Sequence, residues 1–471
     1  MNKFLFTFLF LLFAISLQSC SSCNHKKKNH DTDIVFEKGK VISDVKCKND
    51  FTQSYSLYIP SNYSEDKKCP IVYAFDAHGK GLIPVELFKE NAEKYGYIII
   101  GSNNSKNGTP WNITSEIYDT LYSDTHQRFS IDNTRIYTAG FSGGSRVASS
   151  IALIKGSITG VIGCGAGFPS LDQAPAQKFA FFGIAGKEDF NLNELTSLDS
   201  SLEISGFSHY LEVFDGKHEW PFKAIVNDAF LWLELNAMKD KLKPMNNVLI
   251  NNSFKEFNKN ADTLLSKGNI YDAFLYKKKT MNYFDGLIDI SLVKSGVLEL
   301  SKNAVVLQKQ KYLAALLTKE AVFQSNFTNA ISLQSIDWWR AQVTALNQKI
   351  NTSSDIDEKY MYKRLLNYLS LVAYMNASGT YKAEKFDLAE KYNLIYALVD
   401  PENPEHAYIS ASLFMKKNKQ KEALISLEKS ANLGFEDIAR LETDTVFQSI
   451  KQMPEYLKIV EKMNLNKTKI K

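Results

Sequence analysis

Residues Arg135–Arg146 read Arg-Ile-Tyr-Thr-Ala-Gly-Phe-Ser-Gly-Gly-Ser-Arg, and this stretch decides the fold. A short apolar run ends in a Gly-x-Ser-x-Gly pattern around Ser142, and a helix-like segment over 145–154 follows at once. This order predicts a strand, a sharp turn and a helix, with the serine held at the turn in a strained backbone conformation. Glycines stand two residues before and after it, at Gly140 and Gly144, where a side chain would collide with the packing helix. Ser142 is therefore the candidate nucleophile.

The residues that follow the motif indicate whether it belongs to a catalytic site or occurs by chance. Short patterns of small residues also occur at random, and a Gly-Gly pair after a strand can be only a turn. In a catalytic arrangement an acid and a histidine should follow in that order, each just after a later strand. Asp189 and His218 each follow an apolar, strand-like run. Glu188 is the alternative acid one position away, and Asp215 is a weaker one because it precedes the histidine too closely to reach its ring.

Three such groups have a chemical reason to come together. A serine hydroxyl is a poor nucleophile at neutral pH unless an imidazole removes its proton as it attacks. The imidazole in turn needs a carboxylate that fixes its tautomer and stabilises its cation. We expect Ser142 to attack, His218 to move the proton and Asp189 to orient His218. The alternative for each acid is a solvated loop carboxylate.

Strand-like and helix-like segments alternate through the first half of the chain. The apolar run 71–75 has the continuous pattern of a strand buried on both faces. The alternation predicts an α/β fold: a mostly parallel sheet with helices on both faces, after an antiparallel start at 35–45 and 55–59. The ligand site should lie off the carboxyl ends of the strands. The other predicted strands are 97–100, 135–139, 158–162, 179–184 and 210–214, and the predicted helices are 87–95, 117–129, 145–154 and 222–238.

The loop after the run 71–75 is the candidate for half of an oxyanion hole. His78 and Gly79 stand there, and Gly143 directly follows the candidate nucleophile. Backbone N–H groups at these positions would stabilise the negative oxygen of a tetrahedral intermediate. His78 suits loop shaping better than proton transfer.

Two motifs carry a resemblance to a known family. Arg135-Ile-Tyr precedes the Gly-x-Ser-x-Gly pattern, and residues 216–221 read Gly-Lys-His-Glu-Trp-Pro. From about residue 55 to 239 the sequence resembles the α/β-hydrolases, in particular the extracellular polyhydroxybutyrate depolymerases and the feruloyl or acetylxylan esterases. The resemblance implies an esterase in which Ser142, Asp189 and His218 take the nucleophile, acid and base positions. The chain departs from that branch at Asp76, two residues before His78, which we expect either to alter the oxyanion loop or to contact substrate.

The first residues have the pattern of an export signal. Lys3 precedes an apolar stretch over 4–17 that is too short to span a bilayer comfortably, and Leu-Gln-Ser-Cys closes it at Cys20. That ending resembles a bacterial lipobox, which implies a signal peptide over 1–19 and lipidation of Cys20. An ordinary secretory signal cleaved nearby is the alternative. Residues 20–33 are rich in Ser, Lys, Asn and His and predict a flexible tether.

The export signal bears on whether the cysteines form disulfides. An oxidising compartment permits disulfides, and we expect Cys47 and Cys69 to be the pair to test because they flank strands near the start of the domain. Cys164 lies in an apolar run and is expected to be a buried free thiol.

The second half of the chain predicts helices. We place an α/β-hydrolase domain at 34–239 and a helical domain at 240–471, with helical spacing over 257–267, 270–280, 293–300 and 312–322. Ala389 and Ala423 stand 34 residues apart, as do Ala397 and Ala431. The segment 386–435 resembles tetratricopeptide repeats, which commonly present a concave face to a peptide or protein. The alternative is a helical spacer that packs on the first domain.

Composition narrows the function classes. The chain has 471 residues, 56 basic against 52 acidic, so its net charge of +4 gives no electrostatic case for nucleic acid as the main partner. We expect a lipid-anchored serine esterase of the bacterial cell envelope that needs no metal and no organic cofactor. Its substrate would be an ester, with polysaccharide- or polyester-linked esters as candidates, and the helices would hold a protein or peptide partner. A binding protein with a silent hydrolase domain and a serine peptidase are the alternatives.

Overall fold

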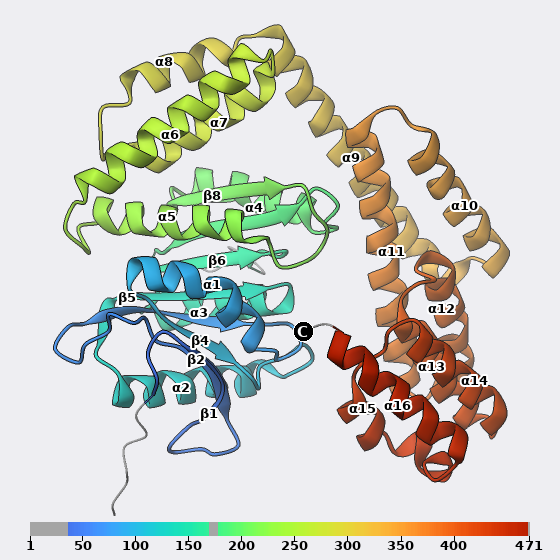
Figure 1. Ribbon diagram of the computed structural model, residues 1–471. Helices are drawn as coiled ribbons and strands as arrows, with labels where there is room; N and C mark the ends of the chain where they lie inside the picture. Colours follow the sequence, from blue (N-terminus) through green and yellow to red (C-terminus); the bar gives the residue numbers. More distant parts are fainter. Residues whose placement is uncertain (1–35, 169–177, 470–471) are drawn as a thin grey trace, which may run out of the picture. The chain divides into compact units, whose positions relative to one another are not determined.

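The computed structural model describes residues 36–168 and 178–469. Eight strands in these ranges form one sheet, in the order β1-β2-β4-β3-β5-β6-β7-β8. Figure 1 shows the strands in blue to green. Their bounds are β1 Val41–Lys46, β2 Ser54–Tyr58, β3 Cys69–Phe75, β4 Ile98–Ser102, β5 Ile131–Phe141, β6 Gly160–Cys164, β7 Ala180–Gly186 and β8 His209–Phe214.

The sheet is parallel from β4 to β8. Strand β1 pairs antiparallel with β2, and β2 pairs antiparallel with β4. The other neighbours are parallel. Strands β3, β4, β6 and β7 are buried along their whole length, and for β3 this confirms the prediction from the continuous apolar run 71–75. The predicted mostly parallel sheet with an antiparallel start is confirmed.

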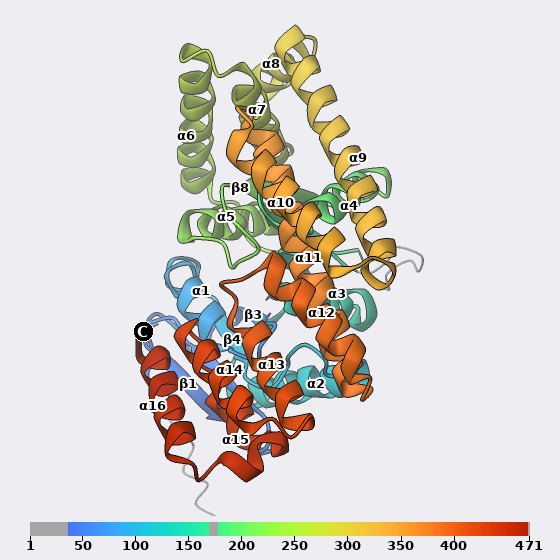
Figure 2. The same ribbon diagram turned by 90° about the vertical axis from the view of Figure 1, so that its right-hand side faces the viewer.

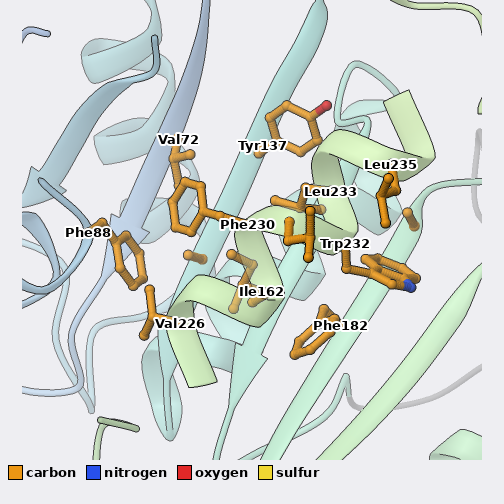
Figure 3. Close-up of a cluster of buried hydrophobic side chains, with 14 of the residues drawn as sticks. Val72, Phe88, Tyr137, Ile162, Phe182, Val226, Phe230, Trp232, Leu233 and Leu235 are labelled. Carbon is orange, nitrogen blue, oxygen red and sulfur yellow. The ribbon is translucent and has the colours of Figure 1, made fainter. Parts of the chain in front are cut away.

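Helices cover both faces of the sheet, and the alternation of side chains along β3 and β5 identifies which helix lies on which face. Val72 and Tyr137 belong to a core cluster with α1 (Leu82–Tyr95) and α5 (Lys223–Lys239), as Figure 3 shows. Tyr73 points to the opposite face, where its hydroxyl lies 2.6 Å from that of Thr125 in α2 (Trp111–Arg128). Thr138 likewise donates to a carbonyl of α3 (Gly143–Lys155).

Helix α4 (Leu192–Ile204) was not among the predicted elements. It follows β7 and lies on the same side of the sheet as α3. A Cβ on Gly183 of β7 would point to that side and would lie 3.7 Å from Cδ2 of Leu195. The leucines of α4 at 192, 195, 198 and 202 have helical spacing. That spacing was the available signal for this helix.

The core does not end where the predicted first domain ends. Ile250 and Phe257 of α6 (Asn247–Ser266), Tyr283 of α7 (Ile270–Phe284) and Val293 of α8 (Ser291–Leu300) belong to the same buried cluster as α5. Residues 38–471 accordingly form one compact unit. The first three helices after residue 239 therefore extend the core of the α/β region.

The remaining helices, drawn in yellow to red in Figure 2, confirm the predicted helical second half. Several begin at a side chain that accepts a first-turn N–H, including Asn303, Ser335, Asp355 and Asn403. Helices α12 and α14 begin 34 residues apart, and Ala389 and Ala423 are fully buried at equivalent positions. The bounds are α9 Ala304–Leu333, α10 Ile336–Thr352, α11 Ile356–Lys382, α12 Phe386–Val399, α13 Pro404–Lys416, α14 Gln420–Asn432, α15 Ile438–Thr443, a 3-10 turn Thr445–Ile450 and α16 Pro454–Lys469.

The predicted disulfide between Cys47 and Cys69 is wrong, because both are buried free thiols. Cys47 follows β1 and Cys69 begins β3, and β2 and β4 lie between these strands. Three strand spacings amount to about 14 Å, whereas a disulfide needs Cα atoms within about 7 Å. Cys164 is a buried free thiol as predicted, and burial raises its pKa.

The predicted signal peptide over 1–19, Cys20 and the tether over 20–33 lie outside the described residues. Within the described ranges, no helix combines the length and the apolar character needed to cross a bilayer. In the same ranges, no group of three or more His, Cys, Asp or Glu side chains is arranged to hold a metal ion.

Candidate active site

The turn between β5 and α3 has the geometry of a nucleophile elbow. Ser142 has φ 54° and ψ −119°, a backbone conformation that non-glycine residues rarely adopt. Its N–H donates to the carbonyl of Cys164 on the neighbouring strand β6 at 2.8 Å, which anchors the turn. A side chain held in this way projects from the carboxyl end of the sheet.

Two glycines allow this turn. A Cβ on Gly140 would lie 2.1 Å from the carbonyl oxygen of Gly144, and one on Gly144 would lie 2.0 Å from that of Phe75. Both distances are far below van der Waals contact with backbone atoms that cannot rotate away. The glycines therefore let α3 begin directly against the ends of β5 and β3.

Replacing Gly140 by alanine is expected to lower the free energy of unfolding by about 1–3 kcal/mol, the usual cost of overpacking. Urea unfolding followed by tryptophan fluorescence would measure it. Gly379→Ala is the matched control, because nothing lies within 4 Å of a Cβ at that position in α11. Equal stability of Gly140→Ala and the control would contradict the tight turn.

Ser142, His218 and Asp189 form a continuous chain of hydrogen bonds. His218 Nε2 lies 2.9 Å from Ser142 Oγ, and His218 Nδ1 lies 2.9 Å from Asp189 Oδ1. The three residues follow β5, β8 and β7, so three separate strand ends bring them together. Asp189 is 1% exposed and His218 is 18% exposed. Asp189 is thus shielded from solvent, whereas Ser142 and His218 are partly exposed.

The residues around Asp189 and His218 hold both side chains in place. Asp189 Oδ1 also accepts the N–H of Asn191 at 2.8 Å, which compensates for its burial. The His218 ring packs against Phe190 and Phe141, with ring centroids 4.2 Å and 4.8 Å away. Gly165 has φ +67°, and a Cβ there would lie 3.1 Å from the imidazole. The imidazole therefore has little freedom to rotate away from the serine.

The two competing acids lie elsewhere. Glu188 Oε1 lies 2.6 Å from Lys363 Nζ on α11, and Asp215 accepts the hydroxyl of Tyr360 on the same helix. Neither carboxylate is placed to accept the Nδ1 proton of His218. The geometry therefore favours Asp189 as the acid.

Asp76 organises the loop after β3. It is 3% exposed, and its Oδ1 accepts the N–H groups of His78 and Lys80 at 2.8 Å and 3.3 Å. Its Oδ2 accepts Trp220 Nε1 at 2.9 Å, which ties this loop to the segment that carries His218. A buried carboxylate with these partners shapes the loop, as one of the two expectations for Asp76 held, and a contact between Asp76 and substrate stays a prediction.

The predicted oxyanion donors are not equally placed. The N–H of His78 donates to the Asp76 side chain, and the N–H of Gly79 donates to the Asp76 carbonyl at 3.1 Å. Both therefore bond within their own loop. The His78 side chain is 74% exposed, and the hydrogen bonds that join Ser142, His218 and Asp189 do not involve it. The N–H of Gly143 lies in the first turn of α3, where backbone donors have no intrahelical acceptor.

Asn107 is a neighbour of the nucleophile that the sequence analysis missed. A Cβ on Gly143 would lie 1.7 Å from Asn107 Oδ1, so the Asn107 side chain packs directly on the residue after Ser142. The loop is held there by the N–H of Asn107, which donates to the carbonyl of Ala77 at 2.8 Å. An Asn-Gly pair at 107–108 signals a turn and nothing about a site.

No protein-family model matches this chain, and no curated protein sequence matches it. Solved structures are similar to it over part of its length, and three of them serve as examples. An S-formylglutathione hydrolase from Staphylococcus aureus is 14% identical with a TM-score of 0.35, covering 42% of this chain and 99% of that one.

The other two have the same level of similarity. The fluorophosphonate-binding serine hydrolase F from Staphylococcus aureus is 14% identical with a TM-score of 0.34, covering 42% of this chain and 99% of that one. A feruloyl esterase module from Clostridium thermocellum, complexed with sinapinate, is 14% identical with a TM-score of 0.35, covering 42% of this chain and 90% of that one.

Proposed function

We propose that this chain is a serine hydrolase that cleaves carboxylic esters through an acyl-enzyme. The observation that carries the proposal is the chain of two 2.9 Å hydrogen bonds from Ser142 Oγ through His218 to the buried Asp189. It begins at a strained elbow, where the serine projects from the sheet. A buried relay that ends on an open hydroxyl is an arrangement for nucleophilic attack.

The first half of the reaction acylates the serine. Ser142 Oγ attacks the ester carbonyl carbon as His218 Nε2 takes the hydroxyl proton, and the carbonyl oxygen becomes an oxyanion. Asp189 holds the proton on His218 Nδ1 and stabilises the imidazolium. When the intermediate collapses, the bond from carbon to the alkoxy oxygen breaks, and the leaving alcohol takes the proton from Nε2. The product of this half is an ester of Ser142.

The second half repeats these steps with water. His218 Nε2 takes a proton from water as its oxygen attacks the acyl carbon, and Ser142 Oγ leaves with that proton. The products are the free acid and the regenerated serine. The chain's own residues carry every proton in this cycle, so the mechanism uses no metal or organic cofactor.

The oxyanion needs donors that are not used elsewhere. We assign one to the N–H of Gly143, which lies in the first turn of α3. The loop after β3 would supply the second from Ala77, since the hydrogen bonds described for this loop occupy the N–H groups of His78 and Gly79 but not that of Ala77. Gly144 supports this pairing, because its missing Cβ lets the end of β3 approach the start of α3.

We further propose that the enzyme works outside the cytoplasm, held to the bacterial cell envelope by a lipid on Cys20. The support is the sequence alone: the charged start, the apolar stretch over 4–17 and the Leu-Gln-Ser-Cys ending. An anchored hydrolase of this kind would act on esters carried by polysaccharides or polyesters, as the sequence resemblance implies. A partner protein or peptide would bind the helices between residues 386 and 435.

Rapid-mixing kinetics with p-nitrophenyl acetate would test the reaction type. The full chain in mild detergent is expected to release about one equivalent of p-nitrophenol per active site in a burst, because an acyl-enzyme accumulates when deacylation is slow. The matched p-nitroanilide is expected to react far more slowly. Equal rates for ester and anilide would favour a peptidase, and no release from either would favour a binding protein.

A further inference from the structure

One face of α11 contacts both loops that carry the acid and the base. The residues are Tyr360, Lys363, Arg364 and Asn367, which we call the α11 face. Their spacing of i, i+3, i+4 and i+7 places them on one side of a helix. They lie about 145 to 179 residues after the loops that they contact. Local sequence therefore plays no part in these contacts.

Three of these residues hold the segment just before Asp189. Arg364 Nη1 donates to the carbonyl of Lys187 at 2.6 Å, and Asn367 Nδ2 donates to the carbonyl of Glu188 at 2.9 Å. Lys363 pairs with the Glu188 side chain. Both carbonyls of the approach to Asp189 thus take their hydrogen bonds from α11.

The same segment is held from the other side by the strand before His218. The N–H of Lys187 donates to the carbonyl of Phe214 at 2.8 Å, and the N–H of Glu188 donates to the carbonyl of Gly216 at 2.9 Å. The backbone before Asp189 is therefore fixed between the histidine loop and α11. Movement of α11 would carry Asp189 with it.

Arg364 is itself held rigidly. Its guanidinium makes paired hydrogen bonds to both carboxylate oxygens of Glu320 on α9, at 2.6–3.0 Å. Arg364 is 5% exposed and Glu320 is 0% exposed. A paired guanidinium and carboxylate has a fixed orientation. The donor that reaches Lys187 is therefore positioned before any substrate binds.

Tyr360 makes the contact to the histidine loop. Its hydroxyl donates to Asp215 Oδ1 at 2.6 Å, three residues before His218. The hydrogen bond to Asp215 and partial burial raise the pKa of Tyr360 to about 12, so the hydroxyl stays protonated as a donor. The α11 face therefore donates hydrogen bonds both to the loop that carries His218 and to the loop that carries Asp189.

We propose that the α11 face positions Asp189 against His218, so that the helical region is a working part of the active site. This rests on the proposed serine-hydrolase function. The four residues bond to Asp215, Lys187 and Glu188 rather than to Ser142, His218 or Asp189, so they act as positioning residues. The relay depends on the distance between a carboxylate and an imidazole on different loops, and a displacement of about 1 Å in a catalytic group costs on the order of a hundredfold in rate.

Asn367→Asp tests the proposal with almost no change in side-chain volume. The substitution removes the N–H donor and puts a carboxylate oxygen against the Glu188 carbonyl. The expected result is a loss of roughly ten- to a hundredfold in kcat, with KM little changed, because the acid shifts while the substrate surface stays. Asn376→Asp is the matched control on the same helix, since the side-chain amide of Asn376 donates to the carbonyl of Val372 in its own helix.

A double-mutant comparison shows whether Asn367→Asp acts by moving Asp189 or by disturbing the fold in general. In an Asp189→Asn background, the effect of Asn367→Asp on kcat is expected to disappear, because the group it positions is already lost. Equal effects in both backgrounds would overturn the proposal.

A proton NMR experiment gives a readout that needs no turnover. The deshielded proton between His218 Nδ1 and Asp189 is expected to shift or broaden in Asn367→Asp and to stay unchanged in Asn376→Asp. An unchanged resonance in Asn367→Asp would also overturn the proposal. Absence of this proton in the unsubstituted chain would instead count against the proposed function itself.

Tyr360→Phe provides a second variant should Asn367→Asp fold poorly. It removes only the hydroxyl that holds Asp215, and we expect a smaller loss in kcat and a shift of the same NMR proton. Tyr368→Phe is its matched control, because the Tyr368 hydroxyl bonds to Thr328 within the helical region. Equal kcat values and spectra for the two tyrosine variants would contradict the role of the α11 face.

Discussion

Replacing Ser142 by alanine is expected to lower kcat/KM for a p-nitrophenyl ester by roughly four to six powers of ten, as loss of a relay nucleophile does. The reason is that Ser142 Oγ is the only hydroxyl in hydrogen-bond contact with His218 among the described residues. Without it no acyl-enzyme can form. Steady-state hydrolysis by the full chain, beside the variant, measures the loss.

Ser149→Ala is the control for this variant. Ser149 lies on the same helix, α3, and its buried hydroxyl has no hydrogen-bond partner among the described residues. Its removal should therefore leave hydrolysis unchanged. Retention of activity by Ser142→Ala would mean that a different residue is the nucleophile.

Replacing Asp189 by asparagine is expected to lower kcat by about 10⁴. The amide is nearly the same size as the carboxylate but offers a donor toward His218 Nδ1, which favours the tautomer with its proton on the wrong nitrogen. The imidazole can then no longer take the proton of Ser142. Steady-state kinetics with the same ester measures the loss, and KM is expected to change little.

Asp262→Asn is the control for the acid, because its carboxylate is 69% exposed and, in the part of the chain that the structure describes, pairs with Lys277 on the neighbouring helix α7. It should keep full activity. A strong loss in Glu188→Gln, together with near-normal activity in Asp189→Asn, would mean that Glu188 is the acid. The pairing of Glu188 with Lys363 argues against that outcome.

Much of the fold could be predicted because its signals are local. The apolar run 71–75 and the glycines around Ser142 determine a buried strand and a tight turn through their own chemistry. Strand order is a property of the whole sheet. The insertion of β2 and β4 between β1 and β3 could not be read from the chain, and the disulfide prediction for Cys47 and Cys69 failed for that reason.

The candidate site divides in the same way. The order of serine, acid and histidine along the chain identified the three side chains, and the structure joins them by two 2.9 Å hydrogen bonds, from Ser142 to His218 and from His218 to Asp189. The sequence could not decide whether Glu188 or Asp189 is the acid. The structure favours Asp189, because Lys363 of the distant helix α11 pairs with Glu188. The use of the His78 and Gly79 N–H groups by Asp76 is likewise a three-dimensional result that no spacing indicates.

Covalent labelling tests the central claim most directly, since it asks for an activated Ser142 without knowledge of the natural substrate. The full chain would be treated with a fluorophosphonate, followed by intact-mass measurement and peptide mapping. We predict one adduct per chain, on Ser142, with none in Ser142→Ala and much slower labelling in Asp189→Asn. No adduct on the unsubstituted chain, or an adduct on another residue, would contradict Ser142 as the nucleophile.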